Sequence, residues 1–257
     1  MEWGYTFELI KTLSLYLDDS WKLIVTGENN LPDFEGHDPS KIIVIQISDE
    51  RYGIPPFASQ VKAVFKHYVR SNKEAENVYP IPQGPMTGFV RLPNRAMKDR
   101  SIDVFFSGNW HTDRRRILEG LKQRLDGKCN VVFLENHCVS MVQPTYSHYM
   151  MDSKIVLDLS GALGPETFRF YEALAAGCVT FSYQKPDNWV YQDNPTIVPD
   201  WNDLDSVANR ILALLEDEDE LQNMSLDNEE FFSLRYNHLD VVEEYILPYL
   251  DLEDAED

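Results

Sequence analysis

The sequence predicts an α/β fold made of two Rossmann-like domains with a cleft between them, and three observations support this prediction. Apolar runs typical of buried strands alternate with helical patterns along most of the chain. Between residues 77 and 88 the alternation stops, because the segment NVYPIPQGPMTG holds three prolines and two glycines, and it then restarts. Buried β-branched strands that alternate with helices form parallel sheets with right-handed crossovers. We therefore expect domains at residues 1–95 and 96–235, followed by a C-terminal segment at 236–257.

The first part of the chain shows four elements. Tyr5 to Leu17 has the periodicity of a helix, and WKLIVTG (residues 21–27) has the apolar run of a strand. KIIVIQIS (residues 41–48) predicts a second strand. PFASQVKAVFKHYVR (residues 56–70) predicts a helix that prolines open.

The second part repeats the alternation more regularly. Strands are expected at residues 101–108, 129–136 and 154–161, and helices at 112–125, 144–153 and 165–177. The apolar runs VTFSY and TIVPDW follow, and then the helix DLDSVANRILALLE. The last segment, residues 228–250, is helical and is expected to pack back across the first half. In open parallel sheets, ligands bind beyond the carboxyl ends of the strands, so functional side chains are expected on the turns from strand to helix.

Composition limits the classes of protein that fit. The apolar share of 43% is ordinary for a globular chain, and no apolar run approaches the roughly 20 residues of a membrane-spanning helix. Three cysteines without metal spacing favour a reducing, cytoplasmic setting without a disulfide framework. The net charge of −20 repels nucleic acid and anionic lipid, so neither is expected as a partner. A chain this acidic needs a local basic pocket to bind an anion.

Residues 152–182 have the pattern of such an anion-binding turn. A buried strand ends at Ser160 and Gly161, and a Gly/Pro loop leads into a helix. Glycine lets a backbone approach a phosphate, and the first N–H groups of a helix attract an anion. Arg169 and Glu172 share one face of that helix, where they fit either a diphosphate and a ribose or an ordinary surface ion pair. Arg114, Arg115 and Arg116 open the earlier helix and add three cations beside Gly108.

These segments resemble the signature of exostosin-like glycosyltransferases, over roughly residues 101–192. ETFRFYEALAAGCVTFSYQKPDNWVY is similar to the R-F-x-E-A-L-x-[AG]-x-C-V run that precedes a strand and a tryptophan loop in that family. Upstream, DVFFSGNWHTDRRRIL and YMMDSKIVLDLSG resemble two further family segments. The positions that match are Phe106, Gly108, Arg115, Leu118, Ser153, Lys154, Leu157, Gly161, Arg169, Glu172, Ala173, Leu174, Cys178 and Val179, with Trp189 in the tryptophan loop.

The resemblance implies a GT-B glycosyltransferase that uses a nucleotide-diphosphate sugar, inverts the anomeric centre and needs no bound metal or other cofactor. By resemblance, Glu172 holds the ribose, and Arg169 and Arg115 face the diphosphate of a UDP- or GDP-linked donor. The remaining donor-binding residues are expected to be Gly108, Lys154, Gly161 and Trp189. Residues 96–235 would then bind the donor and residues 1–95 the glycan or glycoconjugate acceptor. Retaining GT-B enzymes often carry a second glutamate eight residues before the position of Glu172. This chain has Gly164 there, which disfavours a retaining enzyme.

An inverting transfer needs a base that deprotonates the acceptor hydroxyl, and it should come from the first domain. The candidates are Asp49 and Glu50, just past the carboxyl end of a predicted strand, with His37 as the third. Each of them also fits a helix cap or an ordinary loop position.

Two other functions fit the same residues. The short first half and the lack of an unmistakable base also fit a catalytically inactive module that binds a nucleotide or a glycan. Another nucleotide-sugar enzyme, such as an epimerase, is the third possibility. The sequence has no G-x-G-x-x-G turn after a strand and no P-loop, which disfavours a dehydrogenase and an ATPase.

Overall fold

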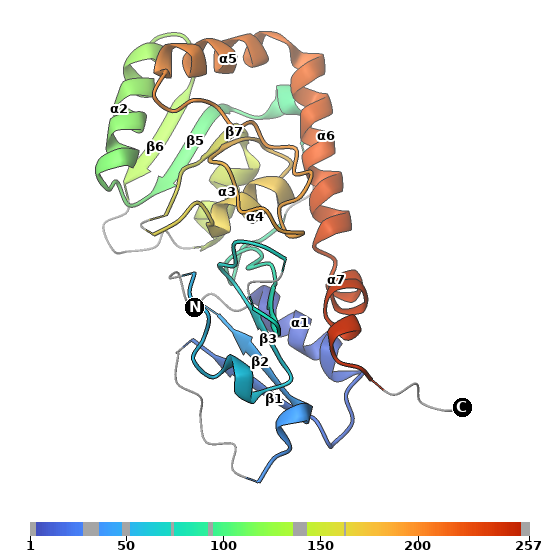
Figure 1. Cartoon of the computed structure of the whole chain (residues 1–257). Coiled ribbons are helices and arrows are strands. Elements are labelled where there is room, and N and C mark those ends of the chain that lie inside the picture. Colours follow the sequence, from blue (N-terminus) through green and yellow to red (C-terminus); the bar gives the residue numbers. More distant parts are fainter. Residues whose placement is uncertain are drawn as a thin grey trace. The chain divides into compact units, whose positions relative to one another are not determined.

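The computed structural model describes residues 4–27, 36–47, 52–72, 75–91, 95–135, 143–161 and 163–252 (Figure 1). The chain divides into two compact units, and each unit combines segments that are distant in sequence. The first unit contains residues 1–84, 186–192 and 234–257, and the second contains residues 85–185 and 193–233. Within the described residues, no helix has the length and apolar character needed to cross a membrane.

The second unit is built on a fully parallel sheet in the order β6-β5-β7-β8. Its strands are β5 (Ile102–Gly108), β6 (Val131–Glu135), β7 (Ser153–Asp158) and β8 (Val179–Ser182). The expected strands of this half are therefore confirmed. The run TIVPDW forms no strand and contributes only a bridge between Ile197 and Phe181.

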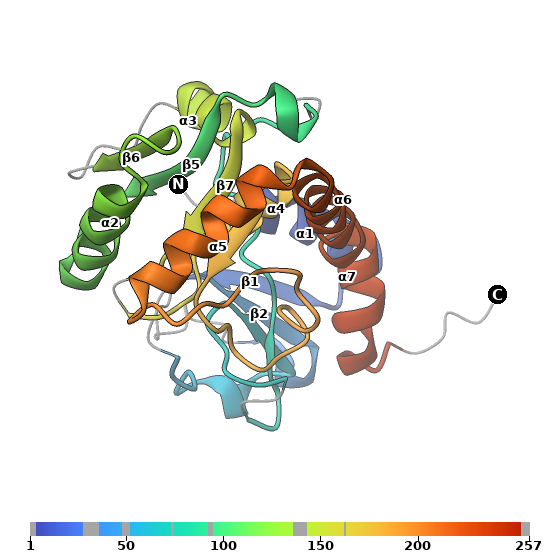
Figure 2. The same ribbon diagram turned by 90° about the horizontal axis from the view of Figure 1, so that it is seen from above.

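Helices cover both faces of this second sheet, because its strands are apolar on both sides. One face packs on α2 (Thr112–Leu125) and α5 (Leu204–Glu216), which lie side by side (Figure 2). The opposite face packs on α3 (Gln143–Met151) and α4 (Phe168–Ala175). Alternation along the strands decides which core a residue joins: Phe106 lies in the core beside α2 and α5, and its neighbour Phe105 in the core beside α3 and α4. The unit is thus a three-layer α/β/α sandwich.

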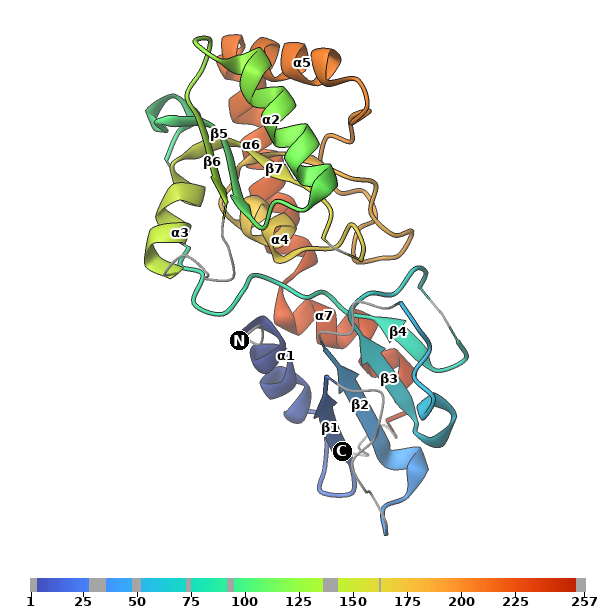
Figure 3. The same ribbon diagram turned by 90° about the vertical axis from the view of Figure 1, so that its left-hand side faces the viewer.

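The first unit has a smaller parallel sheet whose strands follow one another in chain order (Figure 3). They are β1 (Lys22–Thr26), β2 (Ile42–Gln46), β3 (Ala63–Lys66) and β4 (Val78–Pro80). Short 3-10 turns stand at Pro39–Lys41 (η1) and Ala58–Gln60 (η2), and residues from 57 to 61 cover one face of the sheet. The long helix of this unit is α1 (Gly4–Ser14), which was expected from residue 5 onward.

The helix expected at residues 56–70 is wrong. The segment forms η2 and then β3, whose four residues are all buried. A strand buried on both faces lacks the alternation of apolar and polar residues that identifies a strand. The apolar residues of this segment happen to have helical spacing instead, at Phe57, Val61, Val64 and Phe65. The expected connection at residues 77–88 also begins with a strand, β4, and Pro80 is tolerated there because β4 lies at the edge of the sheet.

The C-terminal part of the chain belongs to the first unit from residue 234 onward. Helix α6 (Glu218–Arg235) is followed by α7 (His238–Tyr245) and a 3-10 turn, η4 (Leu247–Tyr249). Helix α7 packs on α1, and the hydroxyl of Tyr5 donates to the carbonyl of Tyr236 at 3.0 Å. Residues 186–192 are fixed in the same unit, where Asn188 donates to the carbonyl of Val69 and the hydroxyl of Tyr236 donates to that of Val190 at 2.6 Å. In chain order, the last segments of the first unit therefore come after the second unit.

Candidate functional site

The strand order of the second sheet creates a topological switch point between β5 and β7. After β5 the chain crosses to β6 on one side through α2, and after β7 it crosses to β8 on the other side through α4. The turns after β5 and β7 therefore diverge and leave a crevice at their carboxyl ends, the usual ligand position in open parallel sheets. Gly108 ends β5, and Gly161 lies in the turn after β7, so both predicted glycines border this crevice.

Arg169 places a buried cation at this switch point. Its side chain is 8% exposed, and Nη2 donates to the carbonyl of Ser107. The guanidinium carbon lies 4.4 Å from the ring centre of Phe106, a cation–π contact that favours the charged group. Nε and Nη1 are buried and have no hydrogen-bond partner. Because buried donors are almost always paired in proteins, these two nitrogens make Arg169 a candidate to bind an anionic or polar ligand.

A second guanidinium, that of Arg114, lies next to the first. It donates to three carbonyls, those of Asn109 at 3.0 Å, Leu159 at 3.1 Å and Ser160 at 2.8 Å, and thereby ties the turn after β5 to the turn after β7. A Cβ added at Gly108 would lie 2.7 Å from Nη2 of Arg169 and 3.4 Å from Nη1 of Arg114. The two cations therefore converge on one glycine, which suits a ligand with two negative charges.

The loop after β7 is closed by its own backbone and by a buried ion pair. Gly161 N–H donates to the carbonyl of Gly164 at 2.7 Å, and the hydroxyl of Ser160 donates to the same oxygen at 2.8 Å. Lys185 donates to the carbonyl of Pro165 and lies 2.5 Å from Asp158, the last residue of β7. These bonds join the described ends of the loop to each other and to the end of β7, beside the guanidinium groups.

Glu172 lies on α4, one turn after Arg169, and is 1% exposed. Its Oε2 accepts from the hydroxyl of Tyr146 at 2.6 Å, and its Oε1 accepts from the N–H of Met86 at 3.2 Å. Burial raises the pKa of this carboxyl, although Tyr146, Arg169 and Met86 each oppose the rise. Each oxygen already accepts one hydrogen bond and could accept another, but the carboxyl is almost fully buried, so a ribose would need a side chain to move to reach it. The ribose role stays a prediction.

The three other expected donor-binding residues differ in position. Arg115 is half-exposed and pairs at 2.9 Å with Glu135, the residue that ends β6 beside Gly108, so it lies at the same carboxyl edge with its charge engaged by that carboxylate. Lys154 lies at the amino end of β7, four strand residues or about 13 Å from Asp158, and pairs with Asp103. Trp189 belongs to the first unit. The structure therefore brings together Gly108, Gly161, Arg169 and Glu172, places Arg115 beside them through Glu135, and adds Arg114.

The placement of Trp189 excludes an open stacking surface. Its ring is 7% exposed and stacks on Tyr245 at 3.7 Å between ring centres. Its indole N–H donates to the carbonyl of Pro80 at 3.1 Å. The tryptophan ties residues 186–192 to β4 and α7.

The candidate bases of the first domain are described only in part. Asp49 and Glu50 lie outside the described residues. His37 is exposed and precedes η1, at the amino end of β2. In a parallel sheet the amino ends lie at the edge opposite to the ligand-binding carboxyl ends, so His37 is not brought to that edge.

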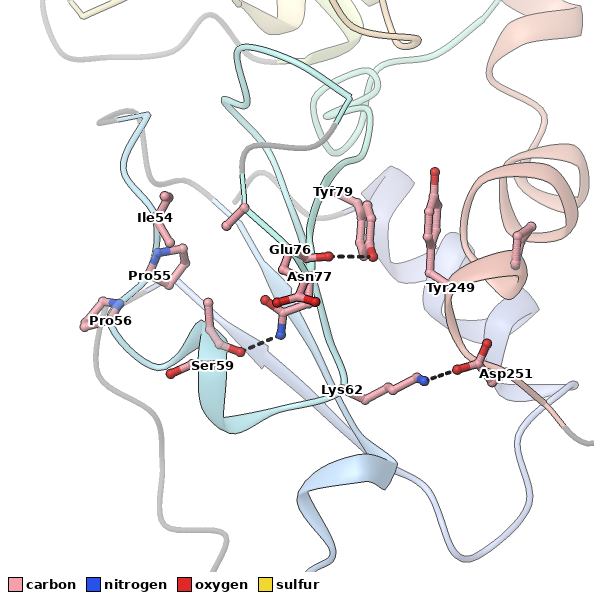
Figure 4. A pocket seen from close by; sticks show the side chains of 13 residues that line it. Ile54, Pro55, Pro56, Ser59, Lys62, Glu76, Asn77, Tyr79, Tyr249 and Asp251 are labelled. Carbon is pink, nitrogen blue, oxygen red and sulfur yellow. Dashed lines mark hydrogen bonds and ion pairs between the residues drawn. The ribbon is translucent and has the colours of Figure 1, made fainter.

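The first unit also has an open pocket of about 770 Å³ at this amino edge (Figure 4). Lys62, which precedes β3, and Asn77, which precedes β4, line it together with the C-terminal Tyr249 and Asp251. Lys62 pairs with Asp251 across the pocket, and the amide of Asn77 donates to the carbonyls of Ala58 and Val61. Its polar groups serve mainly to join chain segments.

Comparisons with known proteins identify the fold. No protein-family model matches the sequence, and no curated protein sequence does. Solved structures of GT-B glycosyltransferases match 95–96% of the chain. TarM superimposes with a TM-score of 0.60 at 11% identity, covering 96% of this chain, while this chain spans 58% of TarM. An α-glucosyltransferase in complex with UDP and a 13-mer DNA containing an HMU base gives 0.56 at 12% identity, over 95% of this chain and 83% of that enzyme.

The chain therefore has the fold of the GT-B glycosyltransferases. A further complex of an α-glucosyltransferase, with UDP and a 13-mer DNA containing an A:G mismatch, matches with a TM-score of 0.53 at 13% identity. These neighbours correct one expectation. The exclusion of nucleic acid from the net charge of −20 is wrong, because proteins of this fold have been solved with DNA, and a local basic surface is enough for phosphate contacts.

Proposed function

We propose that the chain is a glycosyltransferase that moves a sugar from a UDP- or GDP-linked donor to a hydroxyl group of its acceptor. The observation that carries the proposal is the convergence of Arg169 and Arg114 on Gly108, with two buried nitrogens of Arg169 lacking partners. This convergence lies at the switch point of a sheet whose fold is shared with UDP-bound enzymes. A nucleoside diphosphate supplies the two negative charges that the two guanidinium groups can bind.

The arginines also account for catalysis in this proposal. During transfer the acceptor oxygen bonds to the anomeric carbon, and the bond from that carbon to the diphosphate oxygen breaks. The electron pair leaves with the nucleoside diphosphate, and the proton of the acceptor hydroxyl passes to a base. Fixed cations that face the developing charge lower the barrier without reorganising, so Arg169 and Arg114 can do this without a metal ion. Asp49 and Glu50 remain the proposed bases.

The proposal also includes two finer points: the transfer inverts the anomeric centre, and the chain is related to the exostosin-like glycosyltransferases. The position eight residues before Glu172 is Gly164, and its carbonyl is used to close the loop, so no carboxylate stands there. The acceptor class includes glycans, glycoconjugates and, because of the DNA-bound neighbours, nucleic acid that carries a hydroxymethylated base.

Calorimetric titration with UDP and GDP tests the donor site. We expect at least one nucleotide to bind, and Arg169→Ala to weaken it at least tenfold, since charge-assisted hydrogen bonds contribute about 1.5–3 kcal/mol. The matched control is Arg210→Ala, which removes an exposed arginine paired with Glu220 on α6 and should leave affinity unchanged. Equal affinity in the wild type and Arg169→Ala would refute the site.

Release of UDP or GDP from a panel of nucleotide sugars tests turnover. The acceptor arms are oligosaccharides, glycolipids and DNA with hydroxymethyluracil, and NMR of the product anomer distinguishes inversion from retention. Nucleotide binding without release in every arm would favour the inactive binding module instead. Conversion of one nucleotide sugar into its epimer, without an acceptor and without release of the nucleotide, would favour the epimerase.

A further inference from the structure

The carboxyl edge of the first sheet holds buried polar atoms that have no partner. His67 follows β3 and is 3% exposed, and its Nε2 is buried without a hydrogen bond. Gln83 is 1% exposed, and both its amide nitrogen and its amide oxygen lack a partner. An unsatisfied buried polar group costs about 1–3 kcal/mol, so three such atoms at one edge need an explanation.

The backbone shows that these groups belong to one edge. His67 N–H donates to the carbonyl of Gln46, the last residue of β2, at 3.2 Å. Ile81 N–H donates to the carbonyl of Lys66, the last residue of β3, at 3.0 Å, so the chain leading to Gln83 runs beside His67 past the ends of the strands. This is the edge at which parallel sheets bind ligands.

Two aromatic residues with left-handed backbone conformation follow one another in contact from His67: Tyr68 is its neighbour, and Tyr52 packs on Tyr68. Tyr68, next to His67, has a φ of 57°, and Tyr52 has a φ of 50°. For residues with a bulky side chain this left-handed conformation costs about 1–3 kcal/mol and is concentrated at ligand sites. The two rings meet edge to face at 5.7 Å, and His67 lies 6.5 Å from Tyr68.

The chemistry of these groups fits a neutral ligand with hydroxyl groups. An amide offers donors and an acceptor, and a neutral imidazole offers one of each. Burial and the neighbouring Lys66 lower the pKa of His67 to about 3, so the ring stays uncharged at neutral pH and is a poor proton acceptor there. Hydroxyl groups pair with both kinds of atom, and the faces of sugar rings pack against aromatic side chains.

We propose that His67 and Gln83 form a sugar-binding subsite at the carboxyl edge of the first sheet, where they hydrogen-bond hydroxyl groups of a hexose ring. This inference rests on the proposed function, in which the sugar belongs either to the nucleotide-sugar donor or to the acceptor. His67 acts here as a positioning residue and does not accept the acceptor's proton.

NMR of the chain with labelled histidines tests the subsite without turnover. The sequence has six histidines, so the imidazole C–H signal of His67 is identified as the one that disappears in His67→Gln. The probes are UDP and GDP alone, then UDP-glucose, UDP-galactose, UDP-N-acetylglucosamine and GDP-mannose, and then the methyl glycosides of the same four sugars. We expect at least one nucleotide sugar or methyl glycoside to shift the His67 signal, and UDP and GDP to leave it in place.

A shift with a nucleotide sugar alone identifies the donor's sugar, and a shift with a methyl glycoside identifies an acceptor. The subsite would be overturned if no sugar shifts the His67 signal. It would also be overturned if UDP or GDP alone shifts the signal as much as the sugars do. These outcomes are separate from the donor site: nucleotide binding that depends on Arg169 together with a silent His67 leaves the proposed function intact.

Variants provide a second readout. His67→Gln places an amide where Nε2 lies and should retain most activity, whereas His67→Ala should raise KM or lower kcat at least tenfold without changing the affinity for UDP. Gln83→Leu should abolish the sugar-induced shift of His67. The matched control is His238→Gln, which changes a histidine of α7 that stacks on Tyr5 and also lacks a partner at Nε2. It should change neither the shift nor the rate; a loss as large as that of His67→Ala would mean a structural effect.

Discussion

The ammonium group of Lys185 lies 2.5 Å from Oδ2 of Asp158, and their side chains are 1% and 0% exposed. The same carboxylate accepts from the hydroxyl of Thr167 at 2.5 Å and from that of Ser182 at 2.7 Å. One buried charge pair therefore joins the ends of β7 and β8 to the start of α4. Since Lys185 also donates to Pro165, the pair fixes the loop that borders the guanidinium groups.

Removing one member of this pair should be costly. Lys185→Met leaves the Asp158 carboxylate buried and without its cation, so we expect the free energy of unfolding to fall by about 3–5 kcal/mol in urea titrations. The double variant Asp158→Asn with Lys185→Met removes both charges and should recover part of the loss. Arg124→Ala breaks an exposed pair with Asp205 and should cost no more than about 1 kcal/mol. Equal losses in the buried and exposed variants would contradict this account.

Gly108→Ala should damage both the backbone and the donor site. Gly108 has a φ of 154°, and a Cβ there would lie 2.7 Å from Nη2 of Arg169, so the arginine must move. We expect a loss of about 1–3 kcal/mol in stability and at least a tenfold loss of UDP or GDP affinity. Gly127→Ala is the control, because Gly127 also has a positive φ, 67°, but a Cβ there meets nothing within 4 Å. If Gly127→Ala lowers nucleotide affinity as much, the steric argument fails.

The pKa of Glu172 predicts a pH dependence of stability. Burial raises this pKa above the ordinary value of 4.5, so the folded chain retains the proton more strongly than the unfolded chain does. The resulting stabilisation is complete below about pH 4.5 and is lost as pH rises through the raised value. Glu172→Gln cannot ionise, so its unfolding free energy relative to the wild type should increase from about pH 4 to about pH 8. A constant difference over that range would show that Glu172 is not the titrating group.

Much of the second unit could be predicted from sequence, because its strands are β-branched runs that end at glycine or polar residues. The key cation was harder to choose among Arg114, Arg115 and Arg116. One signal was available: Arg114 stands three, four and seven residues before Ile117, Leu118 and Leu121, which are all buried, so it shares the inner face of α2. Arg115 lies off that face and pairs with Glu135 instead.

Other features depend on contacts that local patterns do not contain. Trp189 follows α4 in sequence, yet its ring packs on Tyr245 of α7 in the first unit. Lys154 matches a family position, but the direction of β7 places it at the amino end of the strand. His67 lies in a segment that imitates a helix, so its position at the end of β3 could not be recognised until the strand was known.

The C-terminal turn is expected to stabilise the edge of the first sheet. Tyr249 in η4 stacks on Tyr79 of β4 at 3.8 Å between ring centres, next to the pair of Lys62 and Asp251 (Figure 4). Tyr249→Ala should lower the free energy of unfolding by about 1–2 kcal/mol, since a stacked aromatic pair contributes about 0.5–1.5 kcal/mol beyond its buried area. Asp251→Asn removes only an exposed charge and should cost less than about 1 kcal/mol. Hydrogen exchange of the amides of Val78 and Tyr79 should accelerate in Tyr249→Ala alone; acceleration in both variants would mean that the ion pair, not the ring stack, holds β4 at the edge.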